Sequence, residues 1–65
     1  MMSLQERANL VVEAAEAYYK AVGKTDATPM GKGFYAAQDE EARAQTLLLE
    51  RTGEYLDQRA GRLRD

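Results

Sequence analysis

The basic and helix-breaking residues of this chain are gathered in one short stretch, and that distribution limits what the chain can fold into. All three lysines, the only proline and three of the five glycines lie between Lys20 and Gly33. On both sides of the stretch, apolar residues recur at the three- and four-residue spacings of amphipathic helices. The sequence therefore predicts an all-α fold, a two-helix antiparallel hairpin that forms one domain over residues 1–65.

Local signals set the expected helix boundaries. Ser3 followed by Glu6 matches a capping box, which predicts a first helix over about residues 4–22. Gly23 is the residue type that most often ends a helix in the left-handed conformation, so we expect a turn over residues 23–33. The second helix is then expected over about residues 34–63, with Gly61 as a weak point near its end.

Apolar stripes predict how each helix packs. A heptad seam in the first helix consists of Leu4, Ala8, Val11, Ala15, Tyr18 and Val22. A second stripe beside it consists of Leu10, Ala14, Ala17 and Ala21. In the second helix, a seven-residue repeat consists of Tyr35, Ala42, Leu49, Leu56 and Leu63, with Tyr55 at its side. One partner helix cannot cover the wide apolar arc of the first helix.

Three arguments predict self-association. A chain of 65 residues is shorter than the roughly 70–80 residues below which small folds need reinforcement. It has no cysteine and no histidine, which excludes disulfides and the usual zinc ligands. The expected second helix is also longer than the first, so its apolar end would overhang. We therefore expect a homo-oligomer, most simply a dimeric four-helix bundle. The residues expected at the subunit or partner interface are Leu10, Ala14, Ala17, Ala21, Tyr55, Leu56 and Leu63.

The residue inventory argues against an enzyme. Nucleophilic catalysis needs an activated nucleophile, but the only serine, Ser3, is better explained as a helix cap. Glu13 and Glu16 stand on the polar sector of their helix, where paired carboxylates are ordinary surface residues. We therefore expect no catalytic residue, no metal site and no cofactor.

The turn supports an alternative function, the binding of an anionic small ligand or nucleotide. Its lysines carry a local excess of positive charge, and its glycines allow a ligand to approach the backbone. The residues assigned to this candidate site are Tyr19, Lys20, Lys24, Thr25, Thr28, Gly31, Lys32 and Gly33. The competing interpretation is a solvated turn whose lysines complement the end of the first helix.

The remaining expectations concern partners and location. Arg59, Arg62 and Arg64 form a small basic group that could contact nucleic acid, but a net charge of −2 argues against this role. No apolar run is long enough to predict a membrane span, and the N-terminal residues do not resemble a signal peptide. The sequence thus predicts a small, non-enzymatic, cytoplasmic interaction or regulatory protein that acts as a helical oligomer and binds a partner protein.

Overall fold

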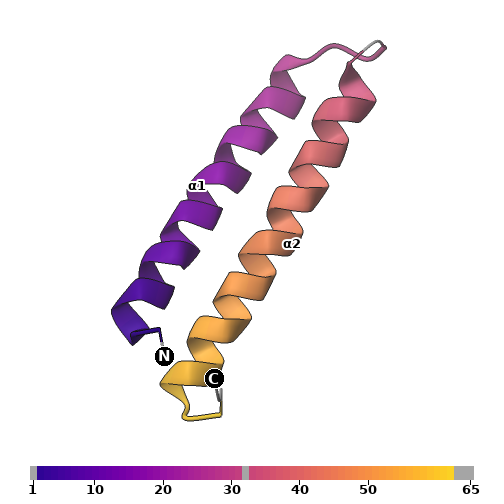
Figure 1. Ribbon diagram of the computed structural model, residues 1–65. Coiled ribbons are helices and arrows are strands. Elements are labelled where there is room, and N and C mark those ends of the chain that lie inside the picture. The colour runs from indigo at the N-terminus through magenta and orange to yellow at the C-terminus, as the bar shows by residue number, and fades with distance from the viewer. Residues whose placement is uncertain (1, 32, 63–65) are drawn as a thin grey trace.

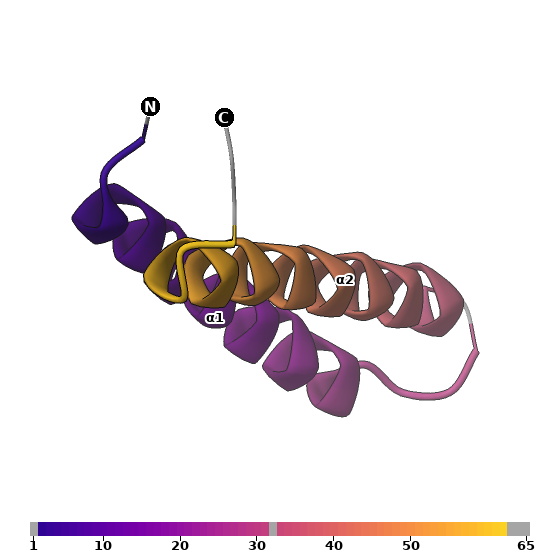
Figure 2. The same ribbon diagram turned by 90° about the horizontal axis from the view of Figure 1, so that it is seen from below.

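The computed structural model describes residues 2–31 and 33–62, and within them the protein is an all-α hairpin. Helix α1 spans Leu4–Ala27 and helix α2 spans Phe34–Arg59. The two helices run antiparallel and lie side by side along their whole length (Figure 1). Viewed from below, they cross at a shallow angle (Figure 2). The predicted two-helix antiparallel hairpin is therefore confirmed.

Ser3 caps the start of α1 largely as the sequence predicts. Its side-chain oxygen accepts a hydrogen bond from the backbone N–H of Glu6 at 3.1 Å. The Ser3 hydroxyl also lies 3.2 Å from the Glu6 carboxylate and donates to it. In a standard capping box, the glutamate carboxylate binds the backbone N–H of the cap residue. Here the Glu6 carboxylate accepts a hydrogen bond from the Ser3 hydroxyl instead.

The end of α1 differs from the prediction, because the helix continues through Gly23 to Ala27. A glycine inside a helix costs about 1 kcal/mol relative to alanine, and contacts with α2 offset that cost here. Lys24 forms an ion pair with Glu40 at 2.8 Å. The Thr25 hydroxyl lies within hydrogen-bond distance of the backbone oxygens of Ala21 and Ala37, at 3.0 and 3.1 Å. Tertiary packing therefore extends the helix past the residue that would end it in isolation.

The seam of α1 is rotated relative to the predicted one. Along α1, the residues turned toward α2 are Arg7, Val11, Ala14, Tyr18, Ala21 and Thr25, all buried or half-buried. This series keeps the predicted heptad spacing and shares Val11 and Tyr18 with the predicted seam. Ala15 and Leu4, which the sequence placed in the seam, are exposed. The prediction missed the true seam because it contains an arginine at one end and a threonine at the other.

The stripe predicted for α2 is likewise not the one that packs against α1. The residues of α2 turned toward α1 are Ala37, Glu41, Ala44, Leu48, Arg51, Tyr55 and Gln58. By contrast, Tyr35, Ala42, Leu49 and Leu56 all remain exposed. Leu63 lies outside the described residues. Of the polar members of the observed seam, Gln58 accepts a hydrogen bond from Arg7, so the arginine in the seam of α1 has a partner in the seam of α2.

No overhang of α2 is present, so that argument for self-association is wrong. Helix α1 has 24 residues and α2 has 26, which makes the helices nearly equal in length. The end of α2 packs against the start of α1, because Gln58 donates from Nε2 to the backbone oxygen of Met2 at 2.9 Å. Helix α2 ends at Arg59, and Gly61 follows in the left-handed conformation with φ of 76°.

The hairpin buries very little apolar surface. Among the described residues, the buried apolar side chains are those of Ala14 and Ala37, at 4% and 2% exposure. The radius of gyration is 14.6 Å, compared with about 11 Å for a compact domain of this length. Fully burying one leucine contributes about 1.5–3 kcal/mol, and no described leucine is fully buried. A single hairpin therefore lacks the core that a stable domain needs.

Candidate functional site

Contacts beside the seam distinguish the two sides of the hairpin. The ion pair of Lys24 and Glu40 lies on one side. Helix residues seven positions apart share a side, so Ala17 lies with Lys24 on α1, and Leu47 lies with Glu40 on α2. The flank of each seam away from this ion pair forms the opposite side of the molecule.

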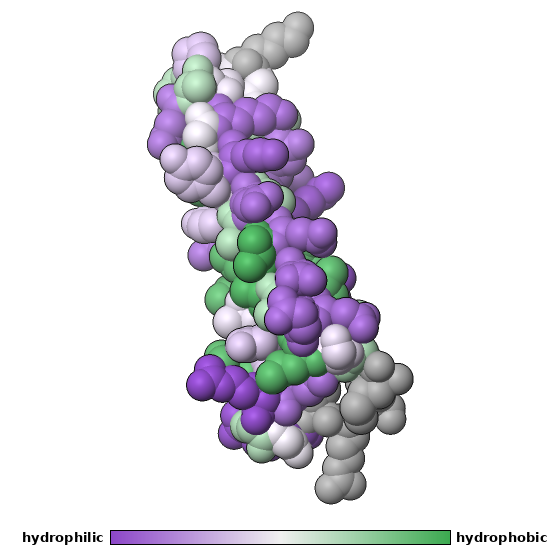
Figure 3. All heavy atoms as spheres, turned by 90° about the vertical axis from the view of Figure 1, so that its left-hand side faces the viewer, coloured by the Kyte–Doolittle hydropathy of each residue, from purple (hydrophilic) through white to green (hydrophobic). Residues whose placement is uncertain are grey.

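The side away from the ion pair carries most of the exposed apolar residues, and we call it the apolar face. Its members are Ala8, Val12, Ala15, Tyr19 and Val22 of α1, and Tyr35, Ala42, Leu49 and Leu56 of α2. Gln38, Gln45 and Thr52 lie between these residues and the seam. None of these positions carries a charge. Seen from the α1 side, hydrophobic side chains are exposed beside a band of hydrophilic ones (Figure 3).

The large side chains of the apolar face are strongly exposed. Tyr19 is 80% exposed, Tyr35 72%, Leu49 65% and Val12 56%. Single exposed apolar residues are normal, but several large ones on one side of a molecule are typical of an interaction surface. The apolar face is therefore the strongest candidate functional site in the described part of the chain.

The opposite side is the charged face. It consists of Glu6, Glu13, Lys20 and Lys24 of α1, and Glu40, Arg43, Glu50, Glu54 and Asp57 of α2. Six of these groups are acidic and three are basic. At the edge of the face, Arg43 pairs with Asp39 at 3.0 Å.

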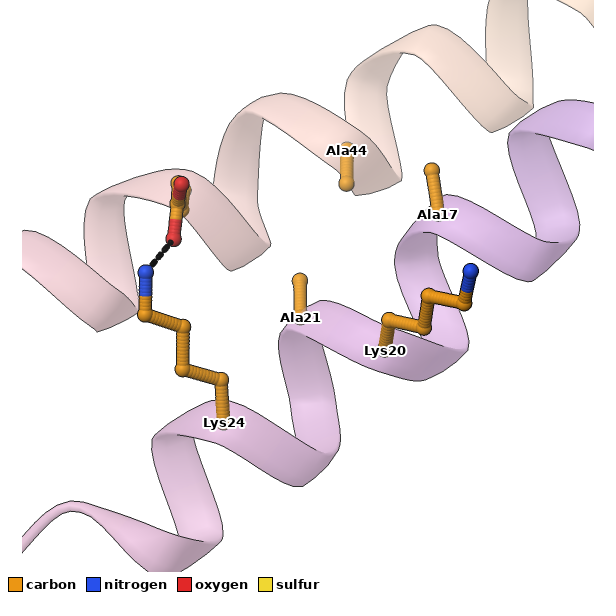
Figure 4. A pocket seen from close by; sticks show the side chains of 6 residues that line it. Ala17, Lys20, Ala21, Lys24 and Ala44 are labelled. Carbon is orange, nitrogen blue, oxygen red and sulfur yellow. Dashed lines mark hydrogen bonds and ion pairs between the residues drawn. The ribbon is translucent and has the colours of Figure 1, made fainter.

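A groove opens between the helices on the charged face. Its volume is about 340 Å³, and its floor is formed by Ala17, Ala21 and Ala44. Figure 4 shows these alanines pointing into the space between α1 and α2, with Lys24 bridging to α2 at one end. Lys20 runs along α1 away from that ion pair. Small side chains keep the helices close here while leaving room above them for a side chain of another molecule.

The residues predicted for the interface are divided among three environments. Ala14 is buried in the hairpin seam, and Ala21 and Tyr55 are half-buried there. Leu10 is half-buried, and Ala17 is exposed, on the charged-face side. Only Leu56 lies on the apolar face, while Leu63 is outside the described residues. The predicted set therefore does not form one surface, because the true seam is rotated relative to the predicted one.

The residues predicted to bind an anion are brought together only in part: Lys24, Thr28 and Gly33 line one pocket of about 550 Å³ beside the acidic side chains of Asp39 and Glu40. Tyr19 lies on the apolar face, away from Lys24, and lines one pocket with Val12, Ala15 and Lys20. The hydroxyls of Thr25 and Thr28 already bind backbone oxygens: that of Thr25 contacts the oxygen of Ala21, and that of Thr28 donates to the oxygen of Lys24 at 2.6 Å. Gly31 and Gly33 lie in the connection with φ of 127° and 94°. Lys32 lies outside the described residues.

The exposed residues of the apolar face on α1 were not predicted to form one surface. The sequence predicts Ala15 in the seam and assigns Tyr19 to the candidate anion site. A seam that contains Arg7 implies a different rotation of α1, and that rotation leaves Val12, Ala15 and Tyr19 exposed. The sequence does not indicate it, because a single arginine at a heptad position is usually a surface residue.

Two kinds of site are absent from residues 2–31 and 33–62. No three acidic side chains lie close enough together to hold a metal ion. Neither helix combines the length and apolar character that crossing a membrane requires. Comparison of the chain with protein-family models, with curated proteins and with solved structures finds no match.

Proposed function

We propose that this protein is a small non-enzymatic interaction or regulatory protein that acts as a helical oligomer and binds a partner protein. One observation carries the proposal: the hairpin exposes an apolar face while burying almost no apolar side chain inside itself. A chain with this distribution reaches a stable fold by burying that face against another chain.

The charged face supports the second half of the proposal, the binding of a partner protein. Assembly through the apolar face would leave the charged face in solvent on the outside of the oligomer. There the groove offers an apolar floor of Ala17, Ala21 and Ala44. Charged side chains surround that floor, as in protein interfaces with an apolar centre and a polar rim. Such a site suits one apolar side chain of a partner, with the flanking charges setting its orientation.

The alternative function, the binding of an anion or nucleotide at the turn, stays a prediction that no contact in the described part of the chain favours. Lys24 is engaged by Glu40, and the hydroxyls of Thr25 and Thr28 bind backbone oxygens. Nucleic-acid binding through the C-terminal arginines has no specific support either, because Arg62 pairs with Asp57 at 3.5 Å. A cytoplasmic location remains an expectation.

The partner-binding proposal can be tested by filling the groove. Ala17→Arg places a long side chain over the alanine floor, and Thr46→Arg is a matched control on the exposed outer surface of α2. Each chain is immobilised and exposed to an extract of the native cells, and retained proteins are quantified by mass spectrometry. We expect the unchanged chain and the Thr46→Arg variant to retain one protein in similar amounts. The amount that Ala17→Arg retains should be roughly tenfold lower, as expected when one central contact is lost.

Two results would count against this assignment. If the assembled, unchanged chain retains no protein above background, partner binding is wrong. If Ala17→Arg retains the same protein at the same level, the groove is not the binding site.

A further inference from the structure

We propose that a second copy of this chain covers the apolar face, and that the two hairpins lie antiparallel, with the turn of each over the open end of the other. This inference rests on the proposed function as a helical oligomer and specifies its interface. It names the surface, the occupant and the relative orientation of the two copies.

The dimensions of the hairpin match those of a stable dimer interface. The molecule measures 46 by 15 by 15 Å, so one face covers about 700 Å², close to the roughly 800 Å² that each partner buries in a standard interface. The occupant must be long and two helices wide to cover such a surface. A second copy has this shape, and four helices then enclose one shared core.

The chemistry of the face also suits a second copy. Its central positions carry no charge, so two copies can pack together without placing like charges in contact. A lipid surface is a poorer match, because the polar face of a membrane-binding helix is typically rich in lysine and arginine, whereas this chain has a net charge of −2.

The arrangement of side chains along the face is compatible with a two-fold axis. Arg7 binds Glu54 and Lys24 binds Glu40, so the levels midway between these contacts lie near Ala15 in α1 and within one turn of Leu49 in α2. A two-fold axis across the hairpin at this level would bring the Leu49 side chains of both copies together.

Residues equally far from that axis would then face one another. Ala42 and Leu56 stand seven residues on either side of Leu49, so the small side chain of one copy would meet the large one of the other. In α1, Val12 and Tyr19 are placed about Ala15 in a similar way. Pairing small with large side chains is what close packing of a core requires.

Charges at the two ends of the apolar face favour the antiparallel orientation. By helical periodicity, Asp26 lies at its turn end and Arg59 at its open end. With the turn of one copy over the open end of the other, each end of the dimer would hold one Asp26 and one Arg59. In the parallel alternative, with both turns at the same end, the two Asp26 side chains would lie together at that end. The two Arg59 side chains would lie together at the other end. Opposite charges across an interface help to fix orientation.

Cysteine cross-linking tests this proposal directly, because the natural chain contains no cysteine. Leu49→Cys places a thiol at the proposed axis. Leu47→Cys is the matched control, since Leu47 is also an exposed leucine of α2 but lies on the charged-face side. The full-length variants are treated with a short bismaleimide, and their masses are compared with the native mass of the unchanged chain.

We expect the unchanged chain to have the mass of a dimer. Leu49→Cys should form covalent dimers at least about tenfold faster than Leu47→Cys, because thiols held together in a complex have millimolar effective concentrations. Both substitutions are modest changes at exposed sites. Should either variant unfold, a helical circular dichroism signal below that of the unchanged chain would reveal it. Gln45→Cys, one turn from Leu49 on the same face, then replaces Leu49→Cys, and Glu50→Cys on the charged face replaces Leu47→Cys.

The outcomes separate the two proposals. A folded monomer at every concentration would overturn both the oligomeric function and this interface. A dimer in which Leu47→Cys cross-links and Leu49→Cys does not would preserve assembly and overturn the apolar-face interface. A dimer in which an Ala15→Cys chain cross-links to a Leu49→Cys chain faster than either links to itself would overturn the antiparallel orientation.

Discussion

The guanidinium of Arg7 reaches across the open end of the hairpin and donates from Nη1 to the Glu54 carboxylate at 2.8 Å. The Nε of the same side chain donates to the Gln58 side-chain oxygen. Arg7 is only 7% exposed, although arginine is rarely buried without a partner. These two hydrogen bonds to α2 fix the first turns of α1 where apolar packing is thin.

We predict that Arg7→Ala lowers the free energy of unfolding by about 2 kcal/mol, since charge-assisted hydrogen bonds contribute roughly 1.5–3 kcal/mol each and Glu54 stays partly solvated. Urea denaturation followed by circular dichroism measures the change. Arg43→Ala is the control, because its pair with Asp39 is exposed and should contribute only about 0.3–0.5 kcal/mol. Equal effects of the two substitutions would show that Arg7 is not a tertiary contact.

Gly23→Ala should stabilise the protein by about 0.5–1 kcal/mol, because Gly23 lies inside α1 and a Cβ there meets no atom within 4 Å. Gly33→Ala is the contrasting variant. Its φ of 94° is a conformation that alanine rarely adopts, so it should destabilise by about 1–2 kcal/mol. Thermal melts of both variants give the comparison. If Gly23→Ala were destabilising, α1 would end at Gly23 in solution.

Thr25→Val should cost about 1 kcal/mol, because it removes a hydroxyl that contacts the backbone oxygen of Ala37 in the other helix at 3.1 Å. Thr46→Val is the matched control, since that hydroxyl binds only the backbone oxygen of Ala42 in its own helix. Chemical denaturation measures the free energy of unfolding of both variants. If Thr46→Val is destabilised as much as Thr25→Val, the hydrogen bond between Thr25 and Ala37 does not stabilise the hairpin.

Gln45→Leu should raise the melting temperature of the proposed dimer and broaden its distribution of oligomers. A buried polar residue in a helical bundle commonly lowers stability while selecting one register and subunit number. Melting curves and native mass spectra of the same samples test both effects. A lower melting temperature would indicate that the Gln45 amide makes hydrogen bonds that leucine cannot replace.

Helix type and order follow from the sequence, because heptad spacing and the cluster of glycine, proline and lysine are local signals. The rotation of each helix does not. By its spacing, Ala15 fits a seam as well as Ala14 does. The contacts of Arg7 with Glu54 and Gln58 on α2 select the rotation in which Arg7 and Ala14 face α2. The extension of α1 past Gly23 likewise depends on Glu40 and Ala37, residues that sequence spacing alone does not place opposite it.

The candidate site is affected by the same uncertainty in rotation. The sequence predicts that one partner helix cannot cover the apolar arc of the first helix, and it assigns the interface to the alanine stripe and to Tyr55, Leu56 and Leu63. Of these residues, Leu56 lies on the exposed apolar face. An error of less than half a helical turn exchanges seam residues for surface residues, and with them the composition of any interface.

Helix α1 begins and helix α2 ends at the same end of the hairpin, opposite the turn (Figure 1). In the antiparallel pair proposed above, the start of α1 and the end of α2 would lie at one end of the dimer in one copy and at the other end in its partner. Two molecules attached to the chain ends would then be separated by about the 46 Å length of the hairpin. The dimer would act as a rigid spacer with two identical attachment points facing in opposite directions.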